Sequence, residues 1–266
     1  QKVKGVFTDP NTAIKCGGAP KKVMYLTNSR LNEAKARANA ELTFYADSGK
    51  LFGVKEYADA IEKQFVARDM KWNLGHNLTA VDFEKKIAIF DKHWEEQGEF
   101  DKDLNEYAKV TKHLDVEAPF DFLHVTPPQK APDEIGKSPI GSAKGWVPVD
   151  KETLQHVKYK NIFAIGDIAA VPMAKTGGSV RKQYKVLVEN LISVMEGKEP
   201  TAKYAGYTVC PLITDIGKVM LAEFDWSAKP TPSFPLDPTQ ERYIWWLMKV
   251  YLLKPMTQYG MLSGKA

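Results

Sequence analysis

Two cysteines are the residues best suited to redox chemistry in this sequence, and the first of them has unusual neighbours. Cys16 follows a lysine and precedes two glycines, Pro20 and two further lysines. A helix predicted to begin near Pro20 would direct its free N–H groups towards the thiol, and together with the lysines these groups favour a thiolate. The glycines permit a tight turn and close approach of a ligand. We therefore predict a reactive sulfur at position 16.

Cys210 has a weaker local case. It lies between a predicted strand and Pro211. A cysteine in such a place is commonly a buried side chain that does no chemistry. Its neighbours alone therefore favour a structural role.

Asp167 is the strongest candidate among the carboxylates. Asn161–Asp167 predicts a buried strand that ends in Gly-Asp, and open α/β sheets bind ligands at the carboxyl ends of their strands. The segment from Lys175 to Ser179 then opens a predicted helix, whose N-terminus would stabilise an anionic group. These residues either bind a ligand that carries hydroxyl groups and negative charge or simply cap the helix, and the local sequence leaves both interpretations open.

The elements that must position these residues alternate between strand and helix in the first half of the chain, which predicts an α/β fold with a mostly parallel sheet. The predicted strands span residues 3–7, 41–46, 78–83, 86–90, 120–125, 161–167, 207–209 and 218–224, and the predicted helices span 20–38, 54–65 and 177–196. Residues 91–117 are charged and weakly periodic, so we expect an exposed insertion in which His93 and His113 are solvated.

Composition excludes several classes of protein. With 266 residues, 44% hydrophobic and 26% charged, the chain is typical of a globular protein. Its net charge of +4 is spread along the sequence and lacks the basic stripe of a nucleic-acid-binding protein. No Cys, Asp or Glu lies at metal-ligand spacing from His76, His124 or His156, so we propose no metal site.

The C-terminal region, residues 240–262, differs in kind from the rest. Tyr243–Leu253 is apolar on nearly all sides and contains paired tryptophans, but it is shorter than the ~20 residues that cross a bilayer. Aromatic residues flanked by lysines are typical of a helix that lies in the membrane interface. A core helix or a dimer interface is the alternative.

Five collinear segments resemble sulfide:quinone oxidoreductases of the branch that includes the mitochondrial enzymes, within the pyridine nucleotide–disulfide type of flavoprotein with two dinucleotide-binding domains. These segments are residues 16–26, 124–128, 150–156, 163–167, and 207–212 together with 221–225. Residues 91–117 have no counterpart that we can match.

The resemblance implies a function for both cysteines. Cys16 and Cys210 would form a disulfide or sulfur-bridged pair that sulfide opens, which leaves a persulfide on one of them. The persulfide sulfur would pass to a small acceptor, while FAD would carry two electrons to a membrane quinone. Breaking a disulfide is faster when the leaving sulfur has a low pKa, and Cys16 is the better candidate for that thiolate.

The resemblance also implies the residues that contact FAD and the quinone. Val209 would pack on the quinone ring, and Lys175 would bring positive charge to the flavin edge. The residues implied at FAD are Thr126, Pro127, Gly166, Asp167, Lys175, Thr176 and Gly177.

The same resemblance predicts three parts: a Rossmann-like second dinucleotide-binding domain over 1–128, the C-terminal half of an FAD domain over 129–200, and a β layer with a membrane- and quinone-binding region over 201–266. The sequence contains no G-x-G-x-x-G turn for the FAD pyrophosphate. We therefore expect the N-terminal half of the FAD domain to be missing and the chain by itself to be inactive. We also expect peripheral, monotopic attachment to a bacterial cytoplasmic or mitochondrial inner membrane, and homo-oligomers.

Three alternatives remain. A type II NADH:quinone dehydrogenase needs no cysteine pair, which counts against it. A subunit like that of flavocytochrome c sulfide dehydrogenase would share the pair. A membrane-binding interaction module without catalysis would have no reactive thiol and no dependence on flavin.

Overall fold

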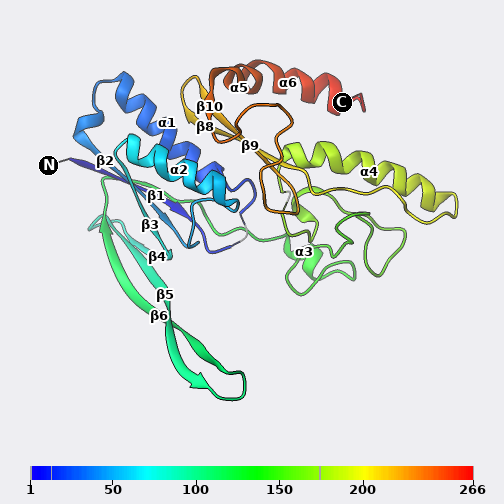
Figure 1. The fold of residues 1–266 in the computed structure, drawn as a ribbon, viewed down its shortest axis with the longest axis horizontal. Helices are drawn as coiled ribbons and strands as arrows, with labels where there is room; N and C mark the ends of the chain where they lie inside the picture. Colours follow the sequence, from blue (N-terminus) through cyan, green and yellow to red (C-terminus); the bar gives the residue numbers. More distant parts are fainter. Residues whose placement is uncertain (1, 13, 174, 266) are drawn as a thin grey trace. The chain divides into compact units, whose positions relative to one another are not determined.

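The computed structural model describes residues 2–12, 14–173 and 175–265, which form two compact units (Figure 1). The first unit comprises Gln1–Thr12, Thr27–Leu51 and Ile61–Pro128. The second comprises Ala13–Leu26, Phe52–Ala60 and Gln129–Ala266. The assignment of residues 1–128, 129–200 and 201–266 to three types of domain remains a prediction.

A parallel sheet forms the centre of the first unit. Its strands are β1 (Val3–Asp9), β2 (Ala40–Ala46), β3 (Met70–Leu74) and β7 (Phe122–His124), in the order β3-β2-β1-β7. Every pair is parallel, so the chain must cross over between strands. Helices α1 (Ala19–Glu33) and α2 (Lys55–Ala67) lie in two of these crossovers, and η1 (Arg37–Asn39) is a short 3₁₀ turn before β2. The predicted α/β class is confirmed.

Aromatic side chains fill the core of this sheet. Phe7 of β1 and Phe44 of β2 stand directly opposite each other in register, and both are fully buried. The ring of Phe44 also meets that of Phe65 on α2 edge-on, with 6.3 Å between centroids. Strands buried on both faces need such continuous apolar runs, which explains why residues 41–46 were recognisable from sequence.

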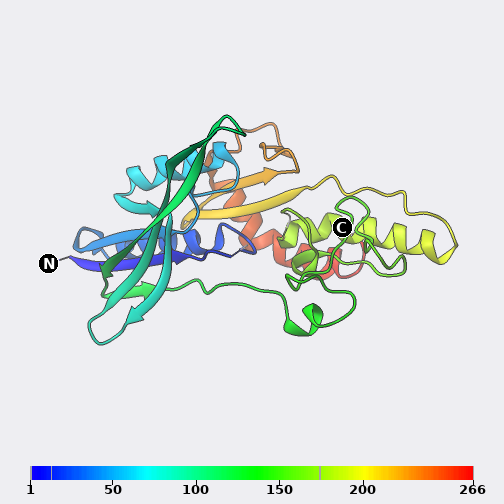
Figure 2. The same ribbon diagram turned by 90° about the horizontal axis from the view of Figure 1, so that it is seen from below.

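A second, antiparallel sheet of the first unit corrects one expectation. Strands β4 (His76–Asp82), β5 (Ile87–Asp101) and β6 (Glu106–Pro119) follow in the order β4-β5-β6. Residues 91–117, expected to be an exposed insertion and assigned no strand, form most of a long β-hairpin that extends from the sheet, its two strands side by side (Figures 1 and 2). Charged residues such as Glu96 and Lys112 interrupt the apolar alternation that would have revealed these strands.

The histidines of the hairpin are at least partly solvated, as expected: His113 is exposed and His93 is partly exposed. His113 hydrogen-bonds the carboxylate of Asp91 through Nδ1 at 2.9 Å. His93 lies with Nε2 3.8 Å from Asp47. Both histidines therefore have carboxylate partners within their own unit.

The second unit contains a small antiparallel sheet and the longest helix. Strands β8 (Thr208–Asp215), β9 (Lys218–Phe224) and β10 (Glu241–Arg242) are arranged in the order β10-β9-β8. Helix α4 spans Gly177–Met195, and α3 (Asp133–Gly136) is a single short turn.

Residues 161–167 correct a second expectation, because they form no regular strand. Phe163 makes only an isolated bridge to Gln155, and η2 (Gly166–Ile168) is a 3₁₀ turn. Gly166 has φ +69°, a left-handed conformation that ends any extended segment. Asp167 therefore follows a turn rather than the end of a strand in a sheet.

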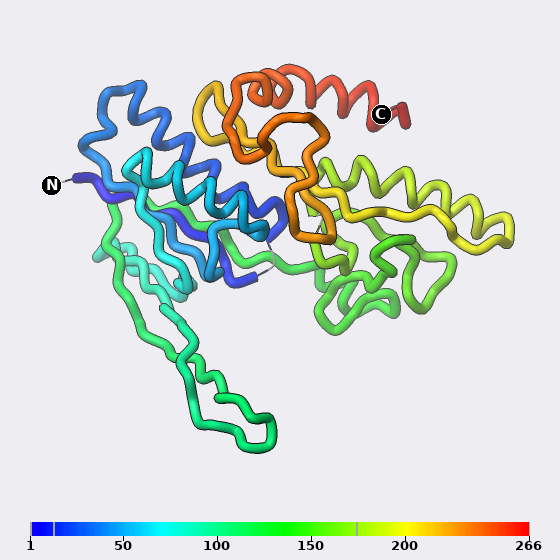
Figure 3. The backbone as a smooth tube through the Cα atoms, in the orientation of Figure 1, coloured from blue at the N-terminus to red at the C-terminus, as the bar shows by residue number. Residues whose placement is uncertain are grey.

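The C-terminal segment is helical from Tyr243 onward. It consists of α5 (Tyr243–Leu247), η3 (Met248–Leu252), α6 (Leu253–Pro255) and η4 (Met256–Met261), which follow one another without a break between them (Figure 3). The two η elements here are wide π-helical turns. Within the part of the chain that the structure describes, no helix is long and apolar enough to cross a membrane.

Candidate active site

The loop before α1 holds Cys16 in a strained but well-anchored conformation. Cys16 has φ +63°, in the left-handed region that residues with a Cβ seldom occupy. Its N–H donates to the carbonyl of Lys175 at 3.2 Å, and its carbonyl accepts from Ala19 N–H at 2.7 Å. These backbone hydrogen bonds fix the direction of the thiol.

The structure brings the two cysteines together. The sulfur of Cys16 lies 3.9 Å from that of Cys210, and both are free thiols. Cys210 lies in β8 and is buried. Pro211 follows it without cost to the sheet because β8 is an edge strand. The role of this pair in catalysis stays a prediction, but its geometry allows the two sulfurs to react with each other after a small movement.

Gly18 makes this approach geometrically feasible. A Cβ at position 18 would lie only 2.7 Å from the sulfur of Cys210 and 3.0 Å from Leu212 Cδ1. At position 17 the nearest atom to such a Cβ would be Ile14 Cγ2 at 3.7 Å, an ordinary contact. The second glycine of the Cys-Gly-Gly sequence is therefore required by packing, whereas the first is not.

The pKa values of the two thiols are shifted in opposite directions. A hydrogen bond from Cys210 and then the charge and hydrogen bond of Lys22 lower the pKa of Cys16 to about 5, against the opposing effect of burial. Lys22 Nζ donates to Cys16 Sγ at 3.5 Å, and Lys249 adds a weaker attraction. The pKa of Cys210 is raised by its hydrogen bond to Cys16 and by burial. These shifts favour a thiolate on Cys16 and a thiol on Cys210.

The start of α4 lies beside the cysteine loop. Thr176 caps the helix, since its hydroxyl accepts a hydrogen bond from Ser179 N–H at 3.2 Å. A Cβ on Gly177 would meet no atom within 4 Å, whereas one on Gly178 would lie 2.1 Å from Val209 Cγ1. The backbone at Gly177 is therefore open to a ligand, while Gly178 packs against Val209.

Lys175 and Asp167 flank this opening. Lys175 is half-buried, with its ammonium 2.9 Å from the carbonyl oxygen of Asp167 and 4.6 Å from the ring centre of Trp146. Burial, and then repulsion from Lys15, lower the pKa of Lys175. The carboxylate of Asp167 is exposed.

The residues predicted to contact FAD are divided between the two units. Lys175, Thr176, Gly177 and the Gly166-Asp167 turn lie in the second unit, and Thr126 and Pro127 lie in the first. Thr126 N–H donates to the hydroxyl of Thr8 at 3.0 Å. An open helix N-terminus, an ammonium and an exposed carboxylate fit a cofactor with anionic and hydroxyl groups, so the residues present are compatible with FAD.

A cavity of about 510 Å³ in the second unit includes the thiolate in its wall. Besides Cys16, its wall includes three cations, Lys22, Arg181 and Lys249, and the predicted quinone contact Val209. The rest is mostly apolar and comes from the small sheet and the C-terminal segment, with Leu221, Phe234, Met248, Leu252, Leu253, Met256 and Met261. An apolar cavity with a few polar groups is typical of a site for a small hydrophobic ligand.

Lys249 and Arg181 were not predicted from sequence. The sequence signal for Lys249 is that it is a single charged residue within the apolar run Tyr243–Leu253. Such a lysine either anchors a helix at the membrane surface or points into a site inside the protein. In the structure it lines the cavity, and burial together with repulsion from Lys22 lowers its pKa.

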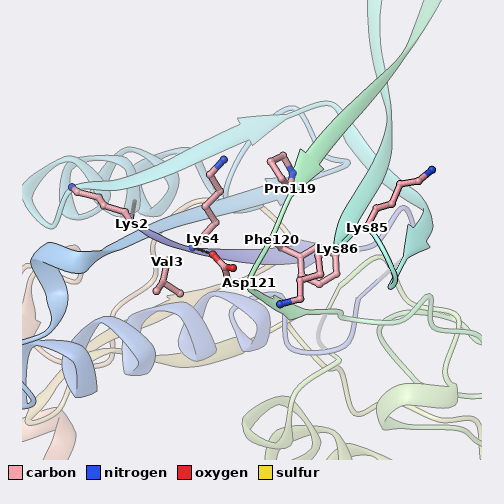
Figure 4. A pocket seen from close by; sticks show the side chains of 8 residues that line it. All are labelled: Lys2, Val3, Lys4, Lys85, Lys86, Pro119, Phe120 and Asp121. Atoms are coloured by element: carbon pink, nitrogen blue, oxygen red, sulfur yellow. Dashed lines mark hydrogen bonds between the residues drawn. The ribbon is translucent and has the colours of Figure 1, made fainter.

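The first unit also contains a hollow, whose wall includes Lys2, Lys4, Lys85, Lys86 and Asp121. Figure 4 shows its four ammonium groups pointing in different directions rather than towards a common point. Within the described ranges no three His, Cys, Asp or Glu side chains are placed to hold a metal ion. The cysteine cavity is therefore the candidate site.

Comparison with known proteins agrees with the resemblance seen in the motifs. The chain is 40% identical to mitochondrial sulfide:quinone oxidoreductase of Mus musculus over 97% of its length and 54% of that protein. It is 35% identical to the enzyme of the same name from Dictyostelium discoideum, over 98% of the chain and 54% of the relative. The resemblance to mitochondrial sulfide:quinone oxidoreductases is confirmed. No family model matches the chain.

The chain spans about half the length of the curated relatives it matches. Among solved structures, sulfide:quinone oxidoreductase of Aquifex aeolicus superposes with a TM-score of 0.69 at 17% identity, over 99% of this chain and 58% of that one. A chain in the mitochondrial ATP synthase structure of Tetrahymena thermophila gives a TM-score of 0.74 at 18% identity, over 97% of this chain and 60% of that one. Such distant likenesses show a shared fold.

The acidity of Cys16 gives a first prediction. Alkylation of the reduced chain by iodoacetamide, followed by mass spectrometry, is expected to label Cys16 much faster than Cys210, with a rate that falls as the pH drops through about 5 because the thiolate becomes protonated. Lys22→Met should move this midpoint upward, and Cys210→Ala should move it further, since the hydrogen bond from Cys210 is the larger cause. The exposed Lys63→Met is the control and should leave it unchanged. A midpoint near 9 in the unmodified chain would show that the pKa of Cys16 is not lowered.

The glycine pair gives a second prediction. Gly18→Ala should destabilise the chain by about 1–3 kcal/mol, because the added methyl overlaps the sulfur of Cys210, and should slow formation of the Cys16–Cys210 disulfide by a mild oxidant. Gly17→Ala is the matched control and should leave both properties nearly unchanged. Urea unfolding and thiol titration measure the two effects, and equal behaviour of the two variants would argue against the packing seen at Gly18.

Proposed function

We propose that this chain supplies the sulfur-oxidising cysteine pair and part of the FAD- and quinone-binding surfaces of a flavoenzyme that oxidises sulfide and reduces a membrane quinone. The observation that carries the proposal is the pair itself: an acidic Cys16 lies 3.9 Å from a buried Cys210 at the wall of an apolar cavity. The similarity to enzymes with this name supports the choice of sulfide and quinone.

The first step uses only residues of this chain. With the pair oxidised, hydrosulfide attacks one sulfur of the Cys16–Cys210 bond, forms a new S–S bond and expels the other cysteine as a thiolate. Expulsion is easier for the sulfur with the lower pKa, which is Cys16. Attack at Cys210 would therefore leave the persulfide there and the thiolate on Cys16, where Lys22 stabilises it.

The following steps return the pair to its starting state. A nucleophilic acceptor removes the outer sulfur of the persulfide and leaves two cysteine sulfurs. When these re-form their bond they release two electrons, so hydrosulfide is oxidised overall to sulfane sulfur plus a proton. FAD, when bound, supplies the chemistry that accepts this electron pair and passes it to the quinone. Lys175, Thr176, Gly177, Gly166 and Asp167 would hold it, together with Thr126 and Pro127.

The quinone and the membrane fit the other side of the cavity. Val209 and the methionine- and leucine-rich C-terminal segment offer an apolar wall for the quinone ring. The same segment exposes large apolar side chains outward, including Tyr251, Tyr259 and Leu262 at 70%, 75% and 80%. A segment with apolar groups on both sides can lie in the membrane interface and admit a lipid-soluble substrate. We therefore propose peripheral membrane attachment through residues 240–262.

The first step can be tested without flavin. The chain is oxidised to the Cys16–Cys210 disulfide, treated with sulfide under argon, alkylated and analysed by mass spectrometry. One cysteine is expected to gain a single sulfur atom as a persulfide while the other becomes a free thiol. Cys16→Ser and Cys210→Ser, which have no disulfide to open, should gain none. A disulfide that survives excess sulfide would exclude this step, and it would favour the non-catalytic interaction module.

A further inference from the structure

The outer edge of the long hairpin offers a surface for a second strand. β6 is the last strand in the order β4-β5-β6, and among the described strands it pairs with β5 alone. Its residues from Glu106 to Asp115 are all exposed. Such an edge presents unpaired N–H and C=O groups that another strand can use.

Most devices that normally block an edge are missing from the middle of β6. Between Lys109 and Glu117 there is no proline, and the pairing with β5 runs without a bulge, since the only register shift lies at Gln97/Phe100. Lysines at positions 109 and 112 are the remaining device, because charges on an edge repel most partner strands. A partner whose own charges complement these lysines would overcome that repulsion.

One face of the hairpin carries exposed apolar side chains among the charged side chains of Lys92, Glu96 and Lys112. The exposed side chains of Trp94 on β5 and of Val110 and Leu114 on β6 alternate onto the same side, and they are 37%, 40% and 54% exposed. The opposite side carries Lys109 and His113. A two-stranded ribbon is marginally stable in water unless something packs on it.

A second copy of β6 complements the first about a two-fold axis at His113. In that antiparallel register like charges do not face each other, and small apolar residues meet. The opposed pairs, one residue from each copy, are Lys109 with Glu117, Val110 with Val116, Thr111 with Asp115, Lys112 with Leu114, and His113 with His113.

Neighbouring registers are poorer. An axis at Lys112 would place two lysines directly opposite each other, which is unfavourable. An axis at Leu114 would move Lys109 from Glu117 to Pro119 and shorten the paired stretch. Of these three registers, the one about His113 pairs Lys109 with Glu117 and Val110 with Val116.

We propose that the β6 edge is a dimerisation surface on which a second copy of this chain pairs antiparallel about His113. The two ribbons then form one continuous antiparallel sheet, and the contact is isologous because each copy contributes the same strand. The paired stretch is a single short strand from each copy, so we expect a reversible dimer rather than a permanent one. This proposal does not depend on the proposed function.

Charge reversal tests the partner and the register together. In sedimentation velocity over a concentration series, Lys109→Glu and Glu117→Lys should each weaken the dimer about tenfold or more, because each places like charges opposite each other. The double variant should recover most of the loss. Glu95→Gln is the control: it removes the ion pair that Lys109 makes within the hairpin at 3.0 Å but leaves the edge intact, so the dimer should persist.

Disulfide trapping tests the axis. In a Cys16→Ser, Cys210→Ser background, His113→Cys should form a covalent dimer on mild oxidation, since the two residues on the axis face each other. Thr111→Cys is the control, because it lies four positions from its own copy, about 14 Å away along the strand. A chain that stays monomeric at high concentration, a double variant as weak as the singles, or equal trapping at both positions would each overturn the proposal.

Discussion

The close approach of the Cys16 and Cys210 sulfurs is the constraint on which the candidate site depends. Two sulfurs 3.9 Å apart cannot both carry full negative charge in a partly buried place, so one holds the proton and the other is acidic. Lys22 decides which, because its ammonium reaches Cys16. The burial of Cys210 in β8 has the same effect. The asymmetry that thiol–disulfide chemistry needs is thus set by the arrangement of a loop, a helix and a strand.

The close approach of the two sulfurs explains several local features of the sequence. The left-handed backbone at Cys16 and the absence of a Cβ at Gly18 let the loop approach the strand. The hydrogen bond from Cys16 N–H to the carbonyl of Lys175 ties the thiol to the start of α4, where the residues proposed for FAD lie. The C-terminal segment closes the other side of the same cavity and brings in Lys249. One cavity therefore joins the thiolate, the open helix N-terminus and the apolar surface.

The elements that were predictable are those whose patterning reflects burial. The alternation or apolar runs of β1, β2, β9 and α4 follow from a core that each element must meet, and the structure has them within a few residues. The hairpin of residues 91–117 was missed because charged residues such as Glu96 and Lys112 interrupt its alternation of apolar and polar side chains. β3 was missed as well, since Met70–Leu74 mixes lysine and asparagine into a short strand that the sheet, not local propensity, stabilises.

The site was predictable only in part, for related reasons. The glycines and lysines beside Cys16 predicted a reactive thiol there. The neighbours of Cys210 predicted none, and only the resemblance to sulfide:quinone oxidoreductases paired it with Cys16. The predicted strand before Asp167 does not form in the described residues, because Gly166 turns the chain and Phe163 makes only an isolated bridge to Gln155. Lys249 and Arg181 lie far from Cys16 in sequence, so their convergence on one cavity follows from the tertiary structure.

The most direct test of the central claim uses a flavin-loaded protein of the relatives' full length that contains this chain. Sulfide is added under anaerobic conditions while the flavin absorbance is followed, and a soluble quinone is then added; Cys16→Ser and Cys210→Ser are treated in the same way. The account predicts rapid bleaching by sulfide and recovery of colour with quinone, both lost in either variant. Bleaching by NADH but not by sulfide, or bleaching by sulfide that survives loss of either cysteine, would contradict it.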